Sequence, residues 1–208
     1  MTVGYGALPQ PPRPSVASEH SRDSGGAVTE SAIAAIEPPL QASDITVRIA
    51  RPDEYPAIGE LSYAAYASDY EIGEDYAHTL QHPELRTDDY DIWVAEDPAT
   101  GVLLGTTSIL RGLEARGRAL ADELYFRLLA VAPAARRRGI GARLTTLALD
   151  LARERGLRAV SLNSGQNMTG AHALYRSLDF ERIPERDVVI GEGEHAHTVY
   201  TFARPVEA

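Results

Sequence analysis

The most informative segment of the sequence runs from Leu129 to Ala142 and reads LAVAPAARRRGIGA. It begins as an apolar strand, passes through a short turn and continues into the first turn of an amphipathic helix. That first turn leaves backbone N–H groups unpaired and carries the positive end of the helix dipole, so it binds phosphate readily. Gly139 and Gly141 have no side chain to keep an anion away from the backbone. We therefore expect an anion-binding site here; the alternative is a solvated turn without a ligand.

Three consecutive arginines, Arg136–Arg138, strengthen this expectation because guanidinium groups bind phosphate well. Neither common nucleotide-binding motif is present. Ala142 and Arg143 follow Gly141 where the Walker motif requires Lys-Ser or Lys-Thr, and Leu144 stands where the dinucleotide motif requires a third glycine. The expected ligand is therefore another phosphorylated molecule.

The overall charge and composition limit the class of protein. The 208 residues carry 20 basic and 30 acidic side chains, a formal net charge of −10. Nucleic-acid binding needs a basic surface, so we expect no nucleic-acid partner. The absence of cysteine excludes disulfides, thiolate metal sites and cysteine nucleophiles. No apolar run approaches the roughly 20 residues that span a bilayer, and no secretory signal is visible, so we expect a cytoplasmic protein without a membrane partner.

The sequence divides into a tail and one domain. Residues 1–43 hold six of the 13 prolines and few large apolar side chains, which predicts a disordered N-terminal tail. A short helix over Thr29–Ile36 is compatible with this tail, whose role is either that of a docking segment or that of a dispensable leader. Dense, regular patterning begins at Asp44, so we expect a single domain over residues 44–208.

The periodicity of the domain predicts alternating strands and helices. Apolar alternation or continuous apolar runs predict strands, and apolar residues three and four apart predict helices. The expected strands are 45–49, 91–96, 102–110, 123–131, 159–163, 182–190 and 195–203, and residues 111–120 are expected to form a loop. The expected helices are 55–67, 76–81, 140–155 and 169–178. This order predicts an α/β (α+β) domain with a mixed central sheet and helices on both faces.

Two motifs resemble those of the GCN5-related N-acetyltransferase (GNAT) superfamily. Arg136-x-x-Gly139-x-Gly141 resembles the family signature Arg/Gln-x-x-Gly-x-Gly/Ala, and the strand before it resembles the family's fourth strand. Asn167 and the segment Ala171–Phe180, AHALYRSLDF, resemble the family's Asn…Ala-x-x-Leu-Tyr-x-x-Leu-Gly-Phe segment. The resemblance extends over roughly residues 46–203, with the motifs in the family order.

The resemblance implies a single GNAT-like domain that uses acetyl-CoA as co-substrate. It places the pyrophosphate on the amides of the arginine–glycine turn and the pantetheine arm beside the end of the preceding strand. The residues that it assigns to acetyl-CoA are Leu129, Ala130, Val131, Arg136, Arg137, Arg138, Gly139, Ile140, Gly141, Ala142, Asn167 and Tyr175.

The chain departs from the family pattern at two positions. Asp179 replaces the usual glycine after the last helix, which predicts a small cost in stability because Asp adopts a left-handed backbone less readily than Gly. The gap between Asn167 and Tyr175 is one residue longer than the commonest spacing, which puts the role of Asn167 in question.

Acetyl transfer to an amine needs a base for the amine and an acid for the leaving thiolate. The resemblance makes Tyr175 the candidate acid, although its place on an apolar helix face also suits a core residue. Glu123 opens the central strand and is the candidate base; substrate anchor and solvated strand end are equal alternatives.

The acceptor pocket is expected to draw on a region rich in tyrosine, which contains Tyr63, Tyr66, Tyr70 and Tyr76. Tyr66 and Tyr125 are the candidate substrate-binding residues, with ordinary packing as the alternative for each. His195 and His197 alternate on the last strand, but two histidines without a matching carboxylate do not predict a metal site.

The sequence therefore predicts an acetyl-CoA-dependent N-acetyltransferase that acts on a primary amine of a small molecule or a protein. One alternative is a non-catalytic acyl-CoA sensor or scaffold, and another is a transferase with a different acyl donor. The acidic balance mildly favours a cationic acceptor. The oligomeric state stays open, with a homodimer as one expectation.

Overall fold

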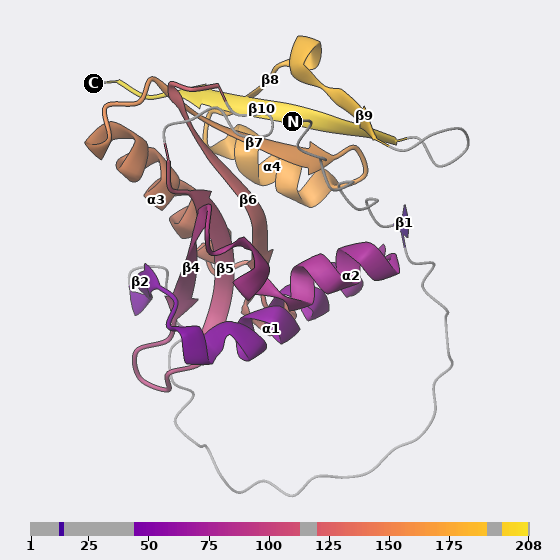
Figure 1. The fold of residues 1–208 in the computed structure, drawn as a ribbon, viewed down its shortest axis with the longest axis vertical. Coiled ribbons are helices and arrows are strands. Elements are labelled where there is room, and N and C mark those ends of the chain that lie inside the picture. Colours follow the sequence, from indigo (N-terminus) through magenta and orange to yellow (C-terminus); the bar gives the residue numbers. More distant parts are fainter. Residues whose placement is uncertain (1–12, 15–43, 113–119, 191–196, 208) are drawn as a thin grey trace, which may run out of the picture.

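A mixed sheet organises the structure around its central strand, β6 (Glu123–Val131) (Figure 1). The structure, a computed structural model, describes residues 13–14, 44–112, 120–190 and 197–207. The strand order in the sheet is β2-β4-β5-β6-β7-β10-β8, with β9 paired to β10. Neighbouring strands pair antiparallel except β6 and β7, which are parallel. The other strands are β2 (Thr46–Ile49), β4 (Tyr90–Glu96), β5 (Leu103–Leu110), β7 (Ala159–Gly165), β8 (Glu181–Arg182), β9 (Val188–Ile190) and β10 (His197–Pro205).

Helices cover both faces of this sheet. They are α1 (Tyr55–Ala67), α2 (Glu74–Gln81), α3 (Ile140–Glu154) and α4 (Thr169–Ser177). Ile58 of α1 packs against Ile92 and Val94 of β4, whereas Leu144 of α3 packs against Ala95 of the same strand. Because successive residues of a strand point to opposite faces, α1 and α3 lie on opposite sides of the sheet. Helix α2 lies beside α1 (Figure 1), and α4 shares an apolar cluster with α3.

The strands β6 and β7 pair over only part of their length. Their register runs from Glu123 and Ala159 to Phe126 and Leu162, and in the described structure it stops there, although both strands continue. On its other side, β6 has an extra residue against β5, because Ser108 pairs with Arg127 and Thr106 with Ala130. Leu128 within this bulge has a left-handed backbone, with φ of 54°. A bulge bends its strand, so β6 turns away from β7 and opens the sheet.

The predicted fold class and most predicted elements are confirmed. Helices α1, α2 and α3 and the hairpin of β4 and β5 lie within a residue or two of their expected positions. Gly156 ends α3 with φ of 65°, and Asp179 after α4 is left-handed, with φ of 57°. The strand expected over 182–190 is wrong: a 3-10 turn, η5 (Pro184–Arg186), interrupts it because proline has no N–H to donate to a neighbouring strand.

Several expectations lie wholly or mainly outside the described residues. The possible helix over 29–36 does, as do His195 and residues 113–119 of the expected loop. Of the expected tail, the structure describes Arg13–Pro14, which form β1 and pair antiparallel with β3 (Tyr70–Glu71). Within the described ranges, no helix has the length and apolar character needed to cross a membrane.

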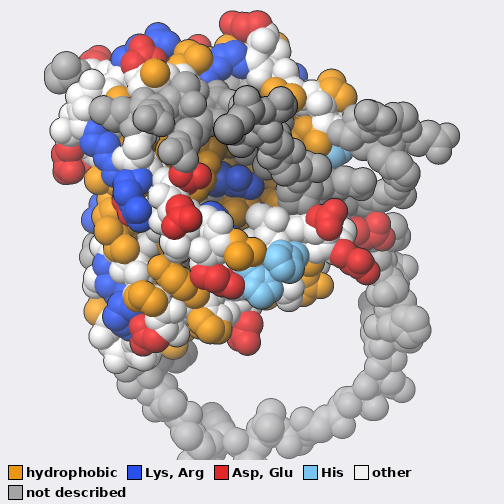
Figure 2. All heavy atoms as spheres, viewed as in Figure 1, with side chains coloured by type: hydrophobic (Ala, Val, Ile, Leu, Met, Phe, Trp, Pro, Cys, Tyr) orange, Lys and Arg blue, Asp and Glu red, His pale blue; other side chains and the backbone are white. Residues whose placement is uncertain are grey.

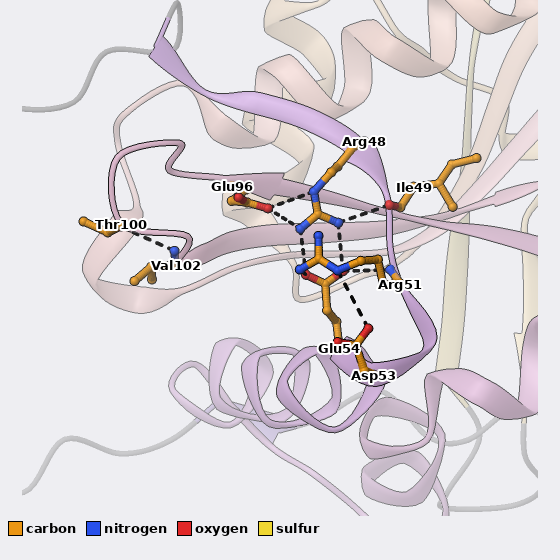
Figure 3. Close-up of polar contacts among 8 residues, drawn as sticks. All are labelled: Arg48, Ile49, Arg51, Asp53, Glu54, Glu96, Thr100 and Val102. Atoms are coloured by element: carbon orange, nitrogen blue, oxygen red, sulfur yellow. Dashed lines mark hydrogen bonds and ion pairs between the residues drawn. The ribbon is translucent and has the colours of Figure 1, made fainter.

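An ion cluster fixes the first strand of the sheet to the start of α1 (Figure 3). Arg48 of β2 donates hydrogen bonds to both carboxylate oxygens of Glu54, at 2.8 and 2.6 Å, and also binds Glu96 of β4. Arg51 binds Glu54 through its backbone N–H at 2.7 Å and its guanidinium at 2.6 Å. The pKa of Glu54 is lowered to about 2, and the largest cause is its hydrogen bond with the Arg48 guanidinium.

The pKa of Glu54 predicts how stability falls in acid. A carboxyl group whose pKa is lowered on folding stabilises the fold above its unfolded pKa near 4.5, and this contribution disappears as the pH falls towards 2. Since one pKa unit corresponds to about 1.4 kcal/mol, the contribution is at most about 3–4 kcal/mol. We expect Glu54→Gln to lower the free energy of unfolding at pH 7 and to flatten its decline between pH 5 and pH 2, measured by urea denaturation.

Glu60→Gln is the matched control, because Glu60 is an exposed residue on α1. This control should follow the acid profile of the parent protein. An unchanged profile in Glu54→Gln would show that the cluster in Figure 3 contributes little to folding.

Candidate active site

A cavity of about 510 Å³ lies where β6 and β7 separate. Its walls come from α1, β6, the turn before α3, the first residues of α3, the end of β7, and α4. It therefore lies between the two halves of the sheet and touches both helix layers. The predicted residues that line it are Tyr66, Leu129, Ala130, Val131, Arg136, Arg137, Gly139, Ile140, Gly141, Ala142 and Tyr175.

The turn before α3 presents backbone donors to this cavity. Arg137 and Gly139 are both left-handed, with φ of 65° and 77°, so the chain turns sharply into the helix. The first hydrogen bond of α3 runs from the Arg143 N–H to the Gly139 carbonyl at 2.9 Å, and the N-cap residue, Gly139, has no side chain that could cap the helix. The N–H groups of the first turn, from Ile140 to Ala142, therefore have no helical acceptor. Together with the helix dipole, they form an anion-binding end of the cavity.

The three arginines of the turn have different surroundings. Arg136 donates to the Ala65 carbonyl at 2.7 Å and to the Ser68 hydroxyl at 2.8 Å, and it forms an ion pair with Asp69 at 3.0 Å. Its guanidinium therefore holds the turn against α1. Arg137 is exposed, lines the cavity and has no ion-pair partner among the described residues, so it can meet an anion. Arg138 is exposed and is not part of the cavity wall.

Gly141 has a packing role as well as the expected role at the anion site. A Cβ atom added at this position would lie 3.0 Å from Cδ2 of Leu174 and 3.8 Å from Cγ2 of Val131. Helix α3 therefore approaches α4 closely here, and a larger residue would push the two helices apart.

The last three residues of β6, Leu129–Val131, form the wall between the anion-binding end and α1. Their β5 side is occupied, because Gly105 pairs with Val131 and Thr106 with Ala130. Their other edge faces the gap left by β7. An extended ligand in this gap can accept and donate strand-like hydrogen bonds.

Tyr175 lies on α4 in an aromatic cluster and lines the cavity. Its ring centroid is 5.7 Å from Phe202, 6.1 Å from Phe180 and 6.2 Å from Phe126. The residue is 5% exposed, and burial raises the pKa of its hydroxyl. Among the described residues, nothing accepts a hydrogen bond from this hydroxyl. Tyr175 is therefore a core residue that also offers a protonated hydroxyl to the cavity.

The structure brings an unexpected asparagine to the cavity. Asn163 of β7 lines it, accepts a hydrogen bond from the Tyr125 hydroxyl at 3.1 Å and donates to the Thr201 hydroxyl at 2.9 Å. Tyr125 and Asn167 are not part of the wall. Tyr125 thus supports a wall residue. The only sequence signal for Asn163 was its place in a strand beside the central one.

Glu123 lies outside the cavity wall, at the start of β6. Arg186 donates two hydrogen bonds to its carboxylate, at 2.9 and 2.8 Å, and the carboxylate is 4% exposed. Burial opposes ionisation, but the Arg186 guanidinium outweighs it, and the pKa of Glu123 is lowered. A buried, ion-paired carboxylate of lowered pKa is a weak base, so this geometry favours a structural role.

The wall also contains one residue that the sequence analysis did not assign to the site and one more of the expected tyrosines. Arg127 of β6 and Tyr70 of β3 line the cavity beside Tyr66. The alternation of β6 could have indicated Arg127, because it lies two residues after Tyr125 and four before Val131. Tyr70 is one of the tyrosines expected near the acceptor pocket, although the short strand that contains it was not expected.

Comparisons with known proteins agree with this geometry. The model of the acetyltransferase (GNAT) family matches residues 55–180. The fold resembles that of yncA from Salmonella typhimurium, described as an acetyltransferase and solved with its cofactor acetyl-CoA (20% identity, 79% of this chain and 95% of that chain, TM-score 0.56).

Two further structures are similar at the same level. One is the ribosomal-protein-S18-alanine N-acetyltransferase from Escherichia coli (18% identity, 79% and 95% coverage, TM-score 0.56), and the other is Ard1 from Thermoplasma volcanium (18%, 79% and 99%, 0.56). No curated protein is significantly similar in sequence. The family match spans more than half of the sequence and includes every residue that lines the cavity. The chain therefore belongs to the acetyltransferase (GNAT) family.

Proposed function

We propose that this protein transfers an acetyl group from acetyl-CoA to a primary amine. The observation that carries the proposal is the cavity between β6 and β7, whose wall combines a cluster of backbone donors with a protonated tyrosine. The backbone N–H groups at the start of α3 suit the pyrophosphate of acetyl-CoA. The open edge of Leu129–Val131 suits its amide-containing pantetheine arm, and Tyr175 would lie near the thioester. Bound acetyl-CoA would supply an activated acetyl group as a thioester.

The residues of the turn would hold the phosphates. The N–H groups at the start of α3 are fixed by the helix, and Arg137 adds a charge at the rim of the cavity. Arg136 keeps the turn in place through its contacts with α1. Because these donors are in place before the ligand arrives, binding needs little reorganisation.

Tyr175 would supply a proton to the leaving sulfur. Its raised pKa keeps the hydroxyl protonated at neutral pH, and its ring is held on three sides by phenylalanines. Among the described wall residues, Asp69 is the acidic one, and it is ion-paired with Arg136. We infer that the amine enters neutral or gives its proton to water, and that much of the rate comes from positioning.

We also propose a cytoplasmic location and an acceptor that is a small molecule or a protein amine. The alternative of a non-catalytic sensor gains no specific support from the cavity. An amine screen that follows the release of free thiol would separate the two, because a sensor binds acetyl-CoA without turnover.

Arg137→Glu is the direct test of the donor site. We expect it to raise the Kd for acetyl-CoA at least about tenfold by replacing an attractive charge at the anion site with a repulsive one. Arg138→Glu is the matched control, because it makes the same charge change one residue away but outside the wall. It should change the Kd less than about threefold. Calorimetric titration measures both, and equal effects, or no binding by the folded parent protein, would contradict the proposed site.

Tyr175→Phe tests the proton donor. We expect kcat to fall by about 10- to 100-fold while the Kd for acetyl-CoA changes little, since general acids contribute to the transition state. Tyr125→Phe removes a hydroxyl that bonds to Asn163 and lies outside the cavity wall, so its kcat should stay within about threefold. Steady-state kinetics would reject the role of Tyr175 if the two variants had the same kcat.

Glu123→Gln distinguishes a structural glutamate from a base. We expect a loss of about 2–3 kcal/mol in the free energy of unfolding, because the ion pair with Arg186 is buried, and a rate of transfer within about threefold of the parent. Asp122→Asn is the neighbouring control, since its ion pair with Arg158 is exposed and should contribute little. A rate that falls about 100-fold without loss of stability would restore Glu123 as the base.

A further inference from the structure

Arg127 places a positive charge in the cavity at the point where the strands separate. It lies on β6 one residue beyond the last pair with β7, and it is part of the cavity wall. The Thr107 hydroxyl donates to its carbonyl at 3.2 Å, so its backbone is fixed on the β5 side. Its guanidinium carbon is 6.0 Å from the centroid of the Tyr90 ring. An aromatic face supports a cation but does not neutralise its charge.

A second guanidinium group lies on the same face of the sheet. Arg86 donates to the Ser108 hydroxyl at 2.9 Å, and Ser108 is the cross-strand partner of Arg127. Directly opposite residues of an antiparallel pair point to the same face. The other acceptors of Arg86 are the carbonyls of Thr79 and His82, at 2.9 and 3.3 Å, which are neutral. Burial, and after it the charge of Arg127, lowers the pKa of Arg86 to about 10.

Neither guanidinium has a carboxylate partner in the part of the chain that the structure describes. Asp69 lines the cavity but is ion-paired with Arg136, and Glu84 is exposed and bound to the His82 ring at 2.8 Å. By contrast, Arg48 and Arg186 each bind a carboxylate directly. Figure 2 shows basic side chains set back in a hollow of the viewed face, with acidic side chains around it. A partly buried charge without a counter-charge is costly, and an anionic ligand would relieve that cost.

Tyrosine hydroxyls surround the same place. Tyr66 lines the cavity, and its ring meets that of Tyr76 edge to face at 5.6 Å. Burial raises the pKa of both, so both hydroxyls stay protonated. The two hydroxyls share a hydrogen bond, which leaves one proton of the pair for a ligand, and Tyr66 is the member that lines the cavity. Among the described wall residues, the one acidic side chain, Asp69, is ion-paired with Arg136, so the surroundings of Arg127 suit an anion better than a cation.

We propose that the acceptor is a small primary amine that also carries a carboxylate, in the simplest case a free amino acid, and that Arg127 binds that carboxylate. This inference rests on the proposed function, since it concerns the second substrate of the same cavity. A guanidinium group matches the planar carboxylate with two parallel donors, which fixes its orientation. The amine of an amino acid is one carbon away from the carboxylate and would be held where β6 and β7 separate.

The local charge argues against a protein lysine as the acceptor. A lysine side chain brings a cationic amine without a carboxylate beside it, and it would meet Arg127 and Arg86 as like charges. A second anion site for phosphate is also less suitable, because the start of α3 already serves that chemistry. A carboxylate next to the amine would pair with the Arg127 guanidinium, which has tyrosine partners but no carboxylate among the described residues, and would place the amine for transfer.

The test compares the standard L-amino acids with their carboxamides as acceptors, with acetyl-CoA as donor. For the preferred side chain, we expect kcat/KM for the acid to exceed that for the amide by at least about tenfold. Arg127→Met should lower kcat/KM for the acid by about 30- to 100-fold and leave the amide nearly unchanged, because only the acid uses the charge. Arg138→Met is the matched control and should keep the preference for acids.

A second readout does not depend on turnover. The corresponding N-acetyl amino acid should bind the parent protein more tightly than its amide in calorimetric titration, and Arg127→Met should abolish the difference. Arg127→Lys keeps the positive charge but loses the two parallel N–H donors of the guanidinium, so it should give an intermediate preference for the acid. This variant replaces Arg127→Met in the test if Arg127→Met does not fold. The comparison of the acid with its amide in the parent protein tests the inference without any variant.

The outcomes separate this inference from the proposed function. If acetyl-CoA does not bind the parent protein, the proposed function fails. If acetyl-CoA binds but the amides react as well as the acids, or Arg127→Met retains the preference, the inference alone is overturned. The same holds if acetyl-CoA binds and no amino acid is acetylated and no N-acetyl amino acid binds.

Discussion

The site depends on the end of pairing between β6 and β7. A backbone N–H or carbonyl that has no partner strand must form its hydrogen bond with another group. In the gap between β6 and β7, that group is water or a ligand. The bulge at Leu128 imposes this loss, because the extra residue against β5 bends β6 while β7 continues straight to Gly165. The cavity, the open edge of Leu129–Val131 and the position of Arg127 all follow from that one irregularity.

An aromatic cluster keeps the gap from closing. Phe126, Phe180 and Phe202 are buried on the α4 side of the sheet, and Tyr175 packs among them. Aromatic pairs of this kind prefer tilted and edge-to-face contacts, which are more restrictive than aliphatic packing. The last paired residue of β6, Phe126, and Tyr175 of α4 are thus held by the same cluster. This explains why Tyr175 satisfies two descriptions at once, a core residue and a member of the cavity wall.

Local sequence patterns carried the prediction of the fold, and distant contacts limited the prediction of the site. The turn at residues 136–142 was visible because strand, glycines and helix are contiguous. Asp179 was expected to be left-handed, and it is. By contrast, the partner of Glu123 is 63 residues away, and nothing near either residue indicates the ion pair. The fixed role of Arg136, which binds α1 across 71 residues, was hidden for the same reason.

The net charge of the chain did not predict the charge of the cavity, because ion-paired side chains neutralise each other locally. The chain has ten more acidic than basic residues, yet Asp69 and Glu123 are neutralised by Arg136 and Arg186. A ligand therefore interacts with the charges that have no carboxylate partner among the described residues, and in this cavity wall those are Arg127 and Arg137. These two charges lie at different parts of the wall, one beside α1 and β5 and one at the start of α3. A field of this form favours an anionic donor and an anionic acceptor together, although the molecule as a whole repels both.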